Sequence, residues 1–147
     1  MSKRRKTKVY LAGPWFTPDA KIIHRVAKSI MKEQLTIEPL FPDEMSVGCT
    51  PAQTFHNNVE AIKDCDIVVA LVDVKDVGTA WEIGMAYKLK KRIVLVGADY
   101  ETFTSKTNLM LAYSGDCLLL KDLETFLTYP EGFNKYVIHT KSWEVIE

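Results

Sequence analysis

The chain has 147 residues, of which 47% are apolar and 26% charged, and its formal net charge is zero. This balance is typical of a globular domain, and a chain of this length buries roughly two-thirds of the surface that it exposes when unfolded. The longest uninterrupted apolar run, Ile67–Val72, is too short to span a bilayer, and the start of the chain lacks the pattern of a secretion signal. We therefore expect one domain, over residues 1–147, without membrane association.

Basic side chains are concentrated at the start of the chain, at Lys3, Arg4, Arg5, Lys6 and Lys8. The rest of the chain carries five more acidic than basic side chains. Two interpretations are open, a nucleic-acid-binding arm and a solvated tail, and so short a run favours the tail. A neutral chain also binds polyanions poorly, because nucleic-acid affinity comes largely from neutralised phosphates. We expect residues 1–7 to form a flexible basic tail and no nucleic-acid polymer to be a partner.

Neither the cysteines nor the histidines have the spacing of a metal site or a disulfide framework. The cysteines are odd in number and contain no C-x-x-C pair, and the histidines are scattered. We therefore predict reduced thiols in a cytoplasmic protein, no metal, no cofactor and no catalytic histidine. The residues concerned are Cys49, Cys65, Cys117, His24, His56 and His139.

The first third of the chain predicts a strand, a helix, a second strand and a loop. Lys8–Ala12 is a short apolar segment that ends at glycine and proline, and Ile37–Phe41 is a second one. Thr17 followed by proline is a typical helix start, with the threonine as N-cap. Pro42–Gly48 is predicted to be a polar loop. The helix has apolar residues at the spacing of one face, and these are Ile23, Val26, Ala27 and Ile30.

The remainder of the chain continues the alternation. Thr50 to Gln53 has the pattern of a capping box and opens a second helix. Its predicted buried face consists of Phe55, Val59 and Ile62. The apolar run Ile67–Val72 suits a central strand that is buried on both sides. The later elements are predicted as helices over Gly78–Lys90, Asn108–Ala112 and Leu123–Leu127 and strands over Arg92–Val96 and Cys117–Leu120.

Strands that alternate with helices indicate the α/β class. We predict a doubly wound, five-stranded parallel sheet with helices on both faces. In such sheets ligands bind at the carboxyl ends of the strands, near the switch in strand order. The site residues should therefore lie in the segments that follow each strand.

The segment after the first strand carries two aromatic residues, Trp15 and Phe16. It lacks the glycine patterns of phosphate-binding loops. Two aromatic side chains at the mouth of a sheet suit a flat, mostly apolar ligand such as a nucleobase. The alternative is that both rings simply cover the first helix, and the local sequence leaves both interpretations open.

The segment after the third strand offers two interpretations of Glu82. In the first, Thr79 to Glu82 is a capping box and the glutamate only caps a helix. In the second, Glu82 is a carboxylate in the first helical turn, where the helix N-terminus favours its ionised form, and Asp76 lies nearby to bind a hydroxyl. A carboxylate beside an aromatic-lined pocket is equipped to attack an anomeric carbon.

Two asparagines are candidates for ligand contacts. Asn58 is spaced onto the apolar face of its helix, where its amide needs either a backbone partner or a ligand. Asn108 either caps a short helix or hydrogen-bonds a substrate. The residues themselves leave both pairs of alternatives open.

Three segments together resemble the nucleoside 2-deoxyribosyltransferase family. They are Val9–Phe16, Asp76–Gly84 and Asn108–Leu111, and they follow the order and spacing of that family over about three-quarters of the chain. The middle segment is the specific one. The resemblance implies a flavodoxin-like fold and the transfer of 2-deoxyribose between nucleobases, with deoxynucleosides and free nucleobases as substrates and no cofactor.

The same resemblance implies roles for individual residues. Glu82 matches the nucleophile, Asp76 the acid that holds a sugar hydroxyl, and Tyr10 the tyrosine that orients the nucleophile. Asn108 matches a residue that a neighbouring subunit lends, so the resemblance implies a homo-oligomer. The implied substrate-binding residues are Trp15, Phe16, Asn58, Gly78 and Asn108.

One departure and two alternatives accompany the resemblance. Many members carry an aspartate where this chain has Asn58, and an amide cannot relay a proton. A deoxyribonucleoside 5′-monophosphate N-glycosidase on the same fold is the alternative enzyme, although the segment after the first strand looks wrong for its phosphate. A non-catalytic receiver or nucleotide sensor is the other alternative. Asp73 resembles a receiver's aspartate, but Ala12–Pro14 stands where a receiver needs an acidic pair.

Overall fold

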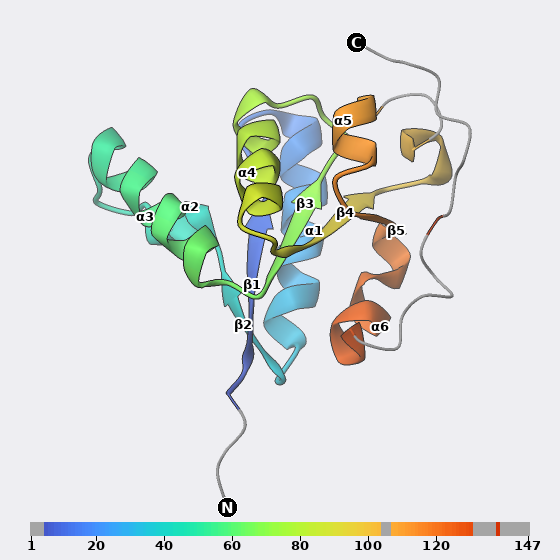
Figure 1. The fold of residues 1–147 in the computed structure, drawn as a ribbon, viewed down its shortest axis with the longest axis horizontal. Helices are drawn as coiled ribbons and strands as arrows, with labels where there is room; N and C mark the ends of the chain where they lie inside the picture. Colours follow the sequence, from blue (N-terminus) through green and yellow to red (C-terminus); the bar gives the residue numbers. More distant parts are fainter. Residues whose placement is uncertain (1–4, 104–106, 131–137, 139–147) are drawn as a thin grey trace, which may run out of the picture.

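The computed structural model describes residues 5–103, 107–130 and 138, and these contain a five-stranded parallel sheet. The strand order is β2-β1-β3-β4-β5, so the order switches between β1 and β3 (Figure 1). This order is that of the flavodoxin-like folds, and the predicted fold class is confirmed. The strands are β1 Thr7–Ala12, β2 Ile37–Leu40, β3 Ile67–Leu71, β4 Arg92–Gly97 and β5 Asp116–Leu119.

Helices cover both faces of this sheet (Figure 1). They are α1 Pro18–Glu33, α2 Pro42–Met45, α3 Pro51–Asp64, α4 Val77–Lys88, α5 Leu109–Ala112 and α6 Leu123–Thr128, with a short 3-10 helix at Leu120–Asp122. Helices α1 and α6 pack on one face, and α3, α4 and α5 pack on the other. None of the helices in the described ranges is long and apolar enough to cross a membrane.

The alternation of side chains along β1 decides which residue faces the site. Val9 and Leu11 pack into the core shared with α1, whereas Tyr10 and Ala12 point into the core shared with α4. All four side chains are fully buried. Because β1 is paired with β2 on one side and with β3 on the other, its backbone cannot shift easily. Tyr10 is therefore held firmly on the α4 side of the sheet.

Both predicted helix starts are confirmed. The Thr17 side chain accepts a hydrogen bond from the Ala20 N–H, and a proline follows in the first turn of α1. The capping box of α3 is complete, since Thr50 accepts from the Gln53 N–H and the Gln53 side chain accepts from the Thr50 N–H. Caps of this kind typically contribute about 1 kcal/mol of stability each.

The buried faces of α1 and α3 differ from the predicted ones. Val26 of α1 is 41% exposed, because it lies about 100° around the helix from its buried neighbour Ala27. The buried residues of α1 are Ala20, His24, Ala27 and Met31. In α3 Ile62 is buried as predicted, but Phe55 is 59% exposed, and its ring packs against the half-exposed ring of Trp81 in α4, with centroids 5.6 Å apart.

Two predicted boundaries were also wrong. The predicted loop Pro42–Gly48 contains the short helix α2, which proline at its first position and two acidic residues in its first turn favour. The predicted tail of residues 1–7 is too long, since Thr7 already belongs to β1 and Arg5 pairs with Asp66 at 2.8 Å. Residues 1–4 lie outside the described residues.

Candidate active site

The central contact of the candidate site joins β1 to α4. The Tyr10 hydroxyl donates a hydrogen bond to Glu82 Oε2, across 72 positions of the sequence. Tyr10 is fully buried and Glu82 is half-buried, so the contact lies largely out of water. The fold thus brings together two residues that lie far apart in the sequence.

Burial sets the protonation of this pair. It raises the pKa of Glu82 to about 7, while the hydrogen bond from Tyr10 lowers that pKa and the charge of Asp76 raises it. Burial also raises the pKa of Tyr10, with a further contribution from Glu82, so the phenol keeps its proton. We expected the helix N-terminus to favour ionised Glu82, and burial outweighs that effect. Glu82 therefore titrates near neutral pH, as functional carboxyl groups in clefts commonly do.

Asp76, rather than Thr79, caps α4. Asp76 Oδ2 accepts hydrogen bonds from both the N–H and the hydroxyl of Thr79, each at 2.8 Å. The helix consequently begins at Val77, and Glu82 lies in its second turn instead of its first. The interpretation of Glu82 as a capping residue is wrong, because its carboxylate is bonded to Tyr10.

Gly78 leaves space for the Asp76 carboxylate. A Cβ atom on Gly78 would stand 3.3 Å from Asp76 Oδ2, which is tighter than most contacts of this kind. The glycine is exposed at the start of α4. It therefore shapes the surroundings of Asp76 through its missing side chain.

The two aromatic residues after β1 lie in different environments. Trp15 and Phe16 pack against each other, with ring centroids 4.7 Å apart. Trp15 is half-buried and its ring lies 5.7 Å from the imidazole of His24 in α1, whereas Phe16 is 69% exposed. Trp15 thus covers α1, and the Phe16 ring remains accessible to a ligand.

Asn58 carries one of the few buried polar atoms without a partner. Its Oδ1 atom is buried and makes no hydrogen bond within the part of the chain that the structure describes. The contact between Phe55 and Trp81 joins α3, which carries Asn58, to α4, which carries Glu82. A backbone partner was one of the two interpretations of Asn58, and the described residues supply none for this oxygen.

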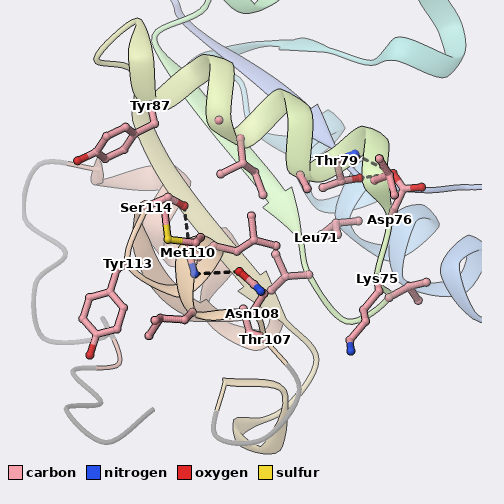
Figure 2. Close-up of a pocket in the computed structure, with 18 residues that line it drawn as sticks. Leu71, Lys75, Asp76, Thr79, Tyr87, Thr107, Asn108, Met110, Tyr113 and Ser114 are labelled. Carbon is pink, nitrogen blue, oxygen red and sulfur yellow. Dashed lines mark hydrogen bonds between the residues drawn. The ribbon is translucent and has the colours of Figure 1, made fainter. Parts of the chain in front are cut away.

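An apolar groove, which the sequence analysis missed, lies between α4 and α5 (Figure 2). Its volume is about 850 Å³. Thr79, Ile83 and Tyr87 line it from α4, at a spacing of four residues that could have revealed this second face. Its lining also includes Asp76, but neither Tyr10 nor Glu82 belongs to it.

Asn108 caps α5 and lines the same groove (Figure 2). Its side chain accepts a hydrogen bond from the Met110 N–H at 2.9 Å, so the capping interpretation is confirmed. Asn108 and Asp76 therefore share the groove, while Tyr10 and Glu82 meet on another side of α4.

The cysteine thiols are not among the groups that form these contacts. All three cysteines are free, and burial raises the pKa of Cys65 to about 11 and that of Cys117 to about 12. A thiol with so high a pKa is unreactive at neutral pH. Within residues 5–103, 107–130 and 138, no three His, Cys, Asp or Glu side chains gather in a way that could hold a metal ion.

The family model described as nucleoside 2-deoxyribosyltransferase matches residues 9–117. Among solved structures, the chain is similar to the 2-deoxyribosyltransferase of Bacillus psychrosaccharolyticus, at 27% identity over 80% of this chain and 90% of that one, with a TM-score of 0.68. It is also similar to the enzyme of that name from Leishmania mexicana, at 21% identity over 84% and 98% of the two chains and a TM-score of 0.62. A CMP N-glycosidase from Clostridium botulinum is similar at 22% identity over 86% and 99%, with a TM-score of 0.58. A comparison with curated proteins gives no match.

The latter two structures, at such low identity, support the fold alone. The family model covers most of the chain, and its span includes Tyr10, Asp76, Glu82 and Asn108. By sequence and by fold, this chain belongs to the nucleoside 2-deoxyribosyltransferase family.

Proposed function

We propose that this protein transfers the 2-deoxyribosyl group of a deoxyribonucleoside from one nucleobase to another, with Glu82 as the nucleophile. The observation that carries the proposal is the hydrogen bond from Tyr10 to Glu82. It places a carboxylate of suitable pKa in a largely buried position, within the span of the family match.

In the proposed reaction a carboxylate oxygen of Glu82 attacks C1′ of the sugar from the face opposite the base. The C1′–N bond breaks as the C1′–O bond forms, through an oxocarbenium-like transition state that the missing 2′-hydroxyl makes accessible. The departing base keeps the bonding electron pair and takes up a proton. A second base then displaces Glu82 from C1′, and two inversions give net retention. Water in place of the second base would give hydrolysis, so the occupied pocket must be dry.

Tyr10 is proposed to orient the nucleophile. Its hydrogen bond occupies Oε2 of Glu82 and leaves the other carboxylate oxygen to attack the sugar. The same bond lowers the pKa of Glu82 and so increases the ionised fraction at neutral pH. Without it, burial alone would leave more of the carboxyl group protonated and unreactive.

Asp76 and Asn58 are proposed to contact the substrate. Asp76 uses Oδ2 to cap α4, which leaves Oδ1 for a sugar hydroxyl. Asn58 would contact the base, flanked by Trp15 and Phe16. Because an amide cannot act as an acid, the proton for the departing base must come from another group or from water.

We also propose a homo-oligomer in which Asn108 completes the site of a neighbouring subunit. The groove that Asn108 lines is apolar, and Met110 and Tyr113 at its α5 side are 77% and 62% exposed. An apolar surface of this kind is typical of an interface between proteins. A second subunit would cover it and bring Asn108 close to another site.

Hydrolysis of a deoxyribonucleoside 5′-monophosphate is the second candidate function. Lys75 precedes Asp76 and lies with it at one end of the groove (Figure 2). If Asp76 holds the sugar, Lys75 would be a candidate cation for a 5′-phosphate.

A base-exchange assay tests the proposal. The protein is mixed with a purine deoxynucleoside and a different free base, and we expect the exchanged nucleoside to form. A matched control is Glu60→Gln, which changes an exposed glutamate of α3 that pairs with Lys63 and should leave exchange unchanged. Failure of exchange across several donor and acceptor pairs would overturn the transferase proposal. Faster release of the base from the 5′-monophosphate than from the nucleoside would favour the second candidate.

A further inference from the structure

Three buried polar side-chain atoms have no hydrogen-bond partner within the described part of the chain. They are His24 Nε2, Asp43 Oδ1 and Asn58 Oδ1. Buried polar atoms of native proteins are nearly always paired, with protein, with water or with a ligand. His24 lies on α1 and Asp43 on α2, whereas Asn58 lies on α3, which packs on the opposite face of the sheet from α1. Lys28 joins α1 to α2, so the unpaired atoms of His24 and Asp43 indicate a polar site between these two helices.

A network of ion pairs fixes Asp43 against α1. Lys28 donates to Asp43 Oδ2 at 2.6 Å and lies 3.3 Å from Glu44, which Lys32 approaches to 2.8 Å. Both lysines also lie over the ring of Phe41, at 5.2 and 5.7 Å from its centroid. These contacts hold the short helix α2 in place. One oxygen of Asp43 is thereby used, and the other is buried without a partner.

His24 lies beside this network. It precedes Lys28 by four residues, so both side chains project from the same side of α1. Its imidazole is 4% exposed and packs against Trp15, a residue of the segment after β1. Burial lowers the pKa of His24 more than the nearby charge of Asp43 raises it, so the ring is neutral at pH 7. A neutral imidazole both donates and accepts a hydrogen bond.

We propose that His24 and Asp43 form a polar subsite that reads the edge of the nucleobase, with Asp43 Oδ1 accepting from an N–H or amino group and His24 Nε2 pairing with the neighbouring ring atom or carbonyl. This inference rests on the proposed function, because it assigns the ligand class of the same site. The subsite favours bases whose edge carries a hydrogen-bond donor beside an acceptor.

Access to this subsite requires Trp15 to move. Both unpaired atoms are closed off from solvent, and the Trp15 ring lies against His24. A base reaches them when that ring turns away and stacks on the base instead. Binding of a base should therefore change the fluorescence of Trp15, and Trp15→Phe should abolish most of that change.

The test combines stability with base binding in His24→Phe. The phenyl ring keeps the packing against Trp15 and removes an unpaired polar atom. We expect an unchanged or higher Tm, because an unsatisfied buried group no longer has to be accommodated. We also expect at least tenfold weaker binding of adenine, cytosine or thymine by calorimetry. A lower Tm with unchanged binding would show that His24 is a structural residue, and would overturn the proposal.

A separate binding measurement tests the role of Asp43. Each base is compared with a counterpart in which the donor nitrogen is methylated, and the native protein should prefer the unmethylated base at least tenfold. Asp43→Asn should reduce that preference. Glu44→Gln is the matched control, since it removes the charge that pairs with Lys28 and Lys32 and leaves both oxygens of Asp43 in place. If Asp43→Asn and Glu44→Gln reduce the preference for the unmethylated base equally, then base binding depends only on the position of α2. That result would contradict the proposed subsite.

The binding measurements separate this inference from the proposed function. If His24→Phe and Asp43→Asn both exchange bases with the base preference of the native protein, the proposed subsite is wrong, and the proposed transferase activity stands. Base binding that depends on His24 and Asp43, in a protein that exchanges no base, would overturn the transferase and leave the subsite.

Discussion

Helix α4 turns Glu82 toward β1 on one side and Thr79, Ile83 and Tyr87 toward α5 on another. The first side carries a half-buried carboxyl group whose pKa is raised to about 7 and which is bonded to a phenol. The second side lines an apolar groove of about 850 Å³. The proposed nucleophile and the apolar groove are therefore separated, since Glu82 does not line the groove. Asp76, at the start of the helix, belongs to the surroundings of both.

The largest expected effect is on the Glu82 side. Glu82→Gln keeps the size of the side chain and its hydrogen bond with Tyr10 but removes the nucleophile, so base exchange should fall by about 10³-fold or more. The thermal stability of Glu82→Gln, by contrast, should increase. The folded-state pKa of Glu82 lies above its ordinary value, so ionisation weakens the native state as pH rises through about 7. Glu82→Gln should therefore have a higher Tm than the native protein at pH 8. Native-like exchange in this variant would refute the role of Glu82.

A smaller loss is expected when the phenol is removed. Tyr10→Phe keeps the buried ring and deletes the hydrogen bond that lowers the pKa of Glu82. We expect an activity loss of about 10- to 100-fold at pH 7 and a shift of the acidic limb of kcat/KM to higher pH. Rate profiles of the two proteins between pH 5 and 9 measure this. If the acidic limb of the kcat/KM profile does not shift in Tyr10→Phe, then Tyr10 does not influence the ionisation of Glu82.

The native protein itself should show a pH dependence of moderate size. Glu82 must be ionised to attack, and its pKa of about 7 means that kcat/KM should rise about tenfold between pH 6 and pH 8. Among the residues that line the groove, only Asp76 acts on the pKa of Glu82, so changes at its other lining residues should leave this profile in place. A profile that is flat over this range would contradict the raised pKa of Glu82.

The smallest expected effect concerns the groove side. Asn108→Ala removes the cap of α5 and should lower stability by about 0.5–2 kcal/mol. It should also lower exchange several-fold, by the same factor at every protein concentration, because a contact is lost rather than the assembly. Sedimentation and kinetics over a range of concentrations measure both. Unaltered kinetics would remove Asn108 from the site, and an effect that vanishes at high concentration would indicate lost assembly.

The fold class could be predicted from the sequence because each helix and strand follows local sequence patterns of capping and apolar spacing. The caps at Thr17 and Thr50 and the apolar strand Ile67–Leu71 depend on residues close in sequence. The side-chain alternation of β1 is equally local. It placed Tyr10 on one side of the sheet, but only the packing of α4 shows that Glu82 meets it there.

The remaining site features depend on tertiary contacts that local patterns do not contain. The sequence predicted a cap at Thr79, and only the structure shows that Asp76 caps α4 and accepts from Thr79. The burial of His24 follows from the face of α1 that packs on the sheet, one step around from the predicted face. The groove depends on α5 lying beside α4, which no spacing within either helix determines.

The central claim is that Glu82 forms a covalent bond to the sugar, and intact-mass spectrometry of the protein tests it most directly. The protein is incubated with a deoxynucleoside without an acceptor base, quenched with acid, and then digested. We predict a mass increase of one 2-deoxyribosyl group, located on the peptide that contains Glu82 and absent from Glu82→Gln. Exchange of bases by a protein that never carries this mass, or that carries it on another residue, would contradict the account.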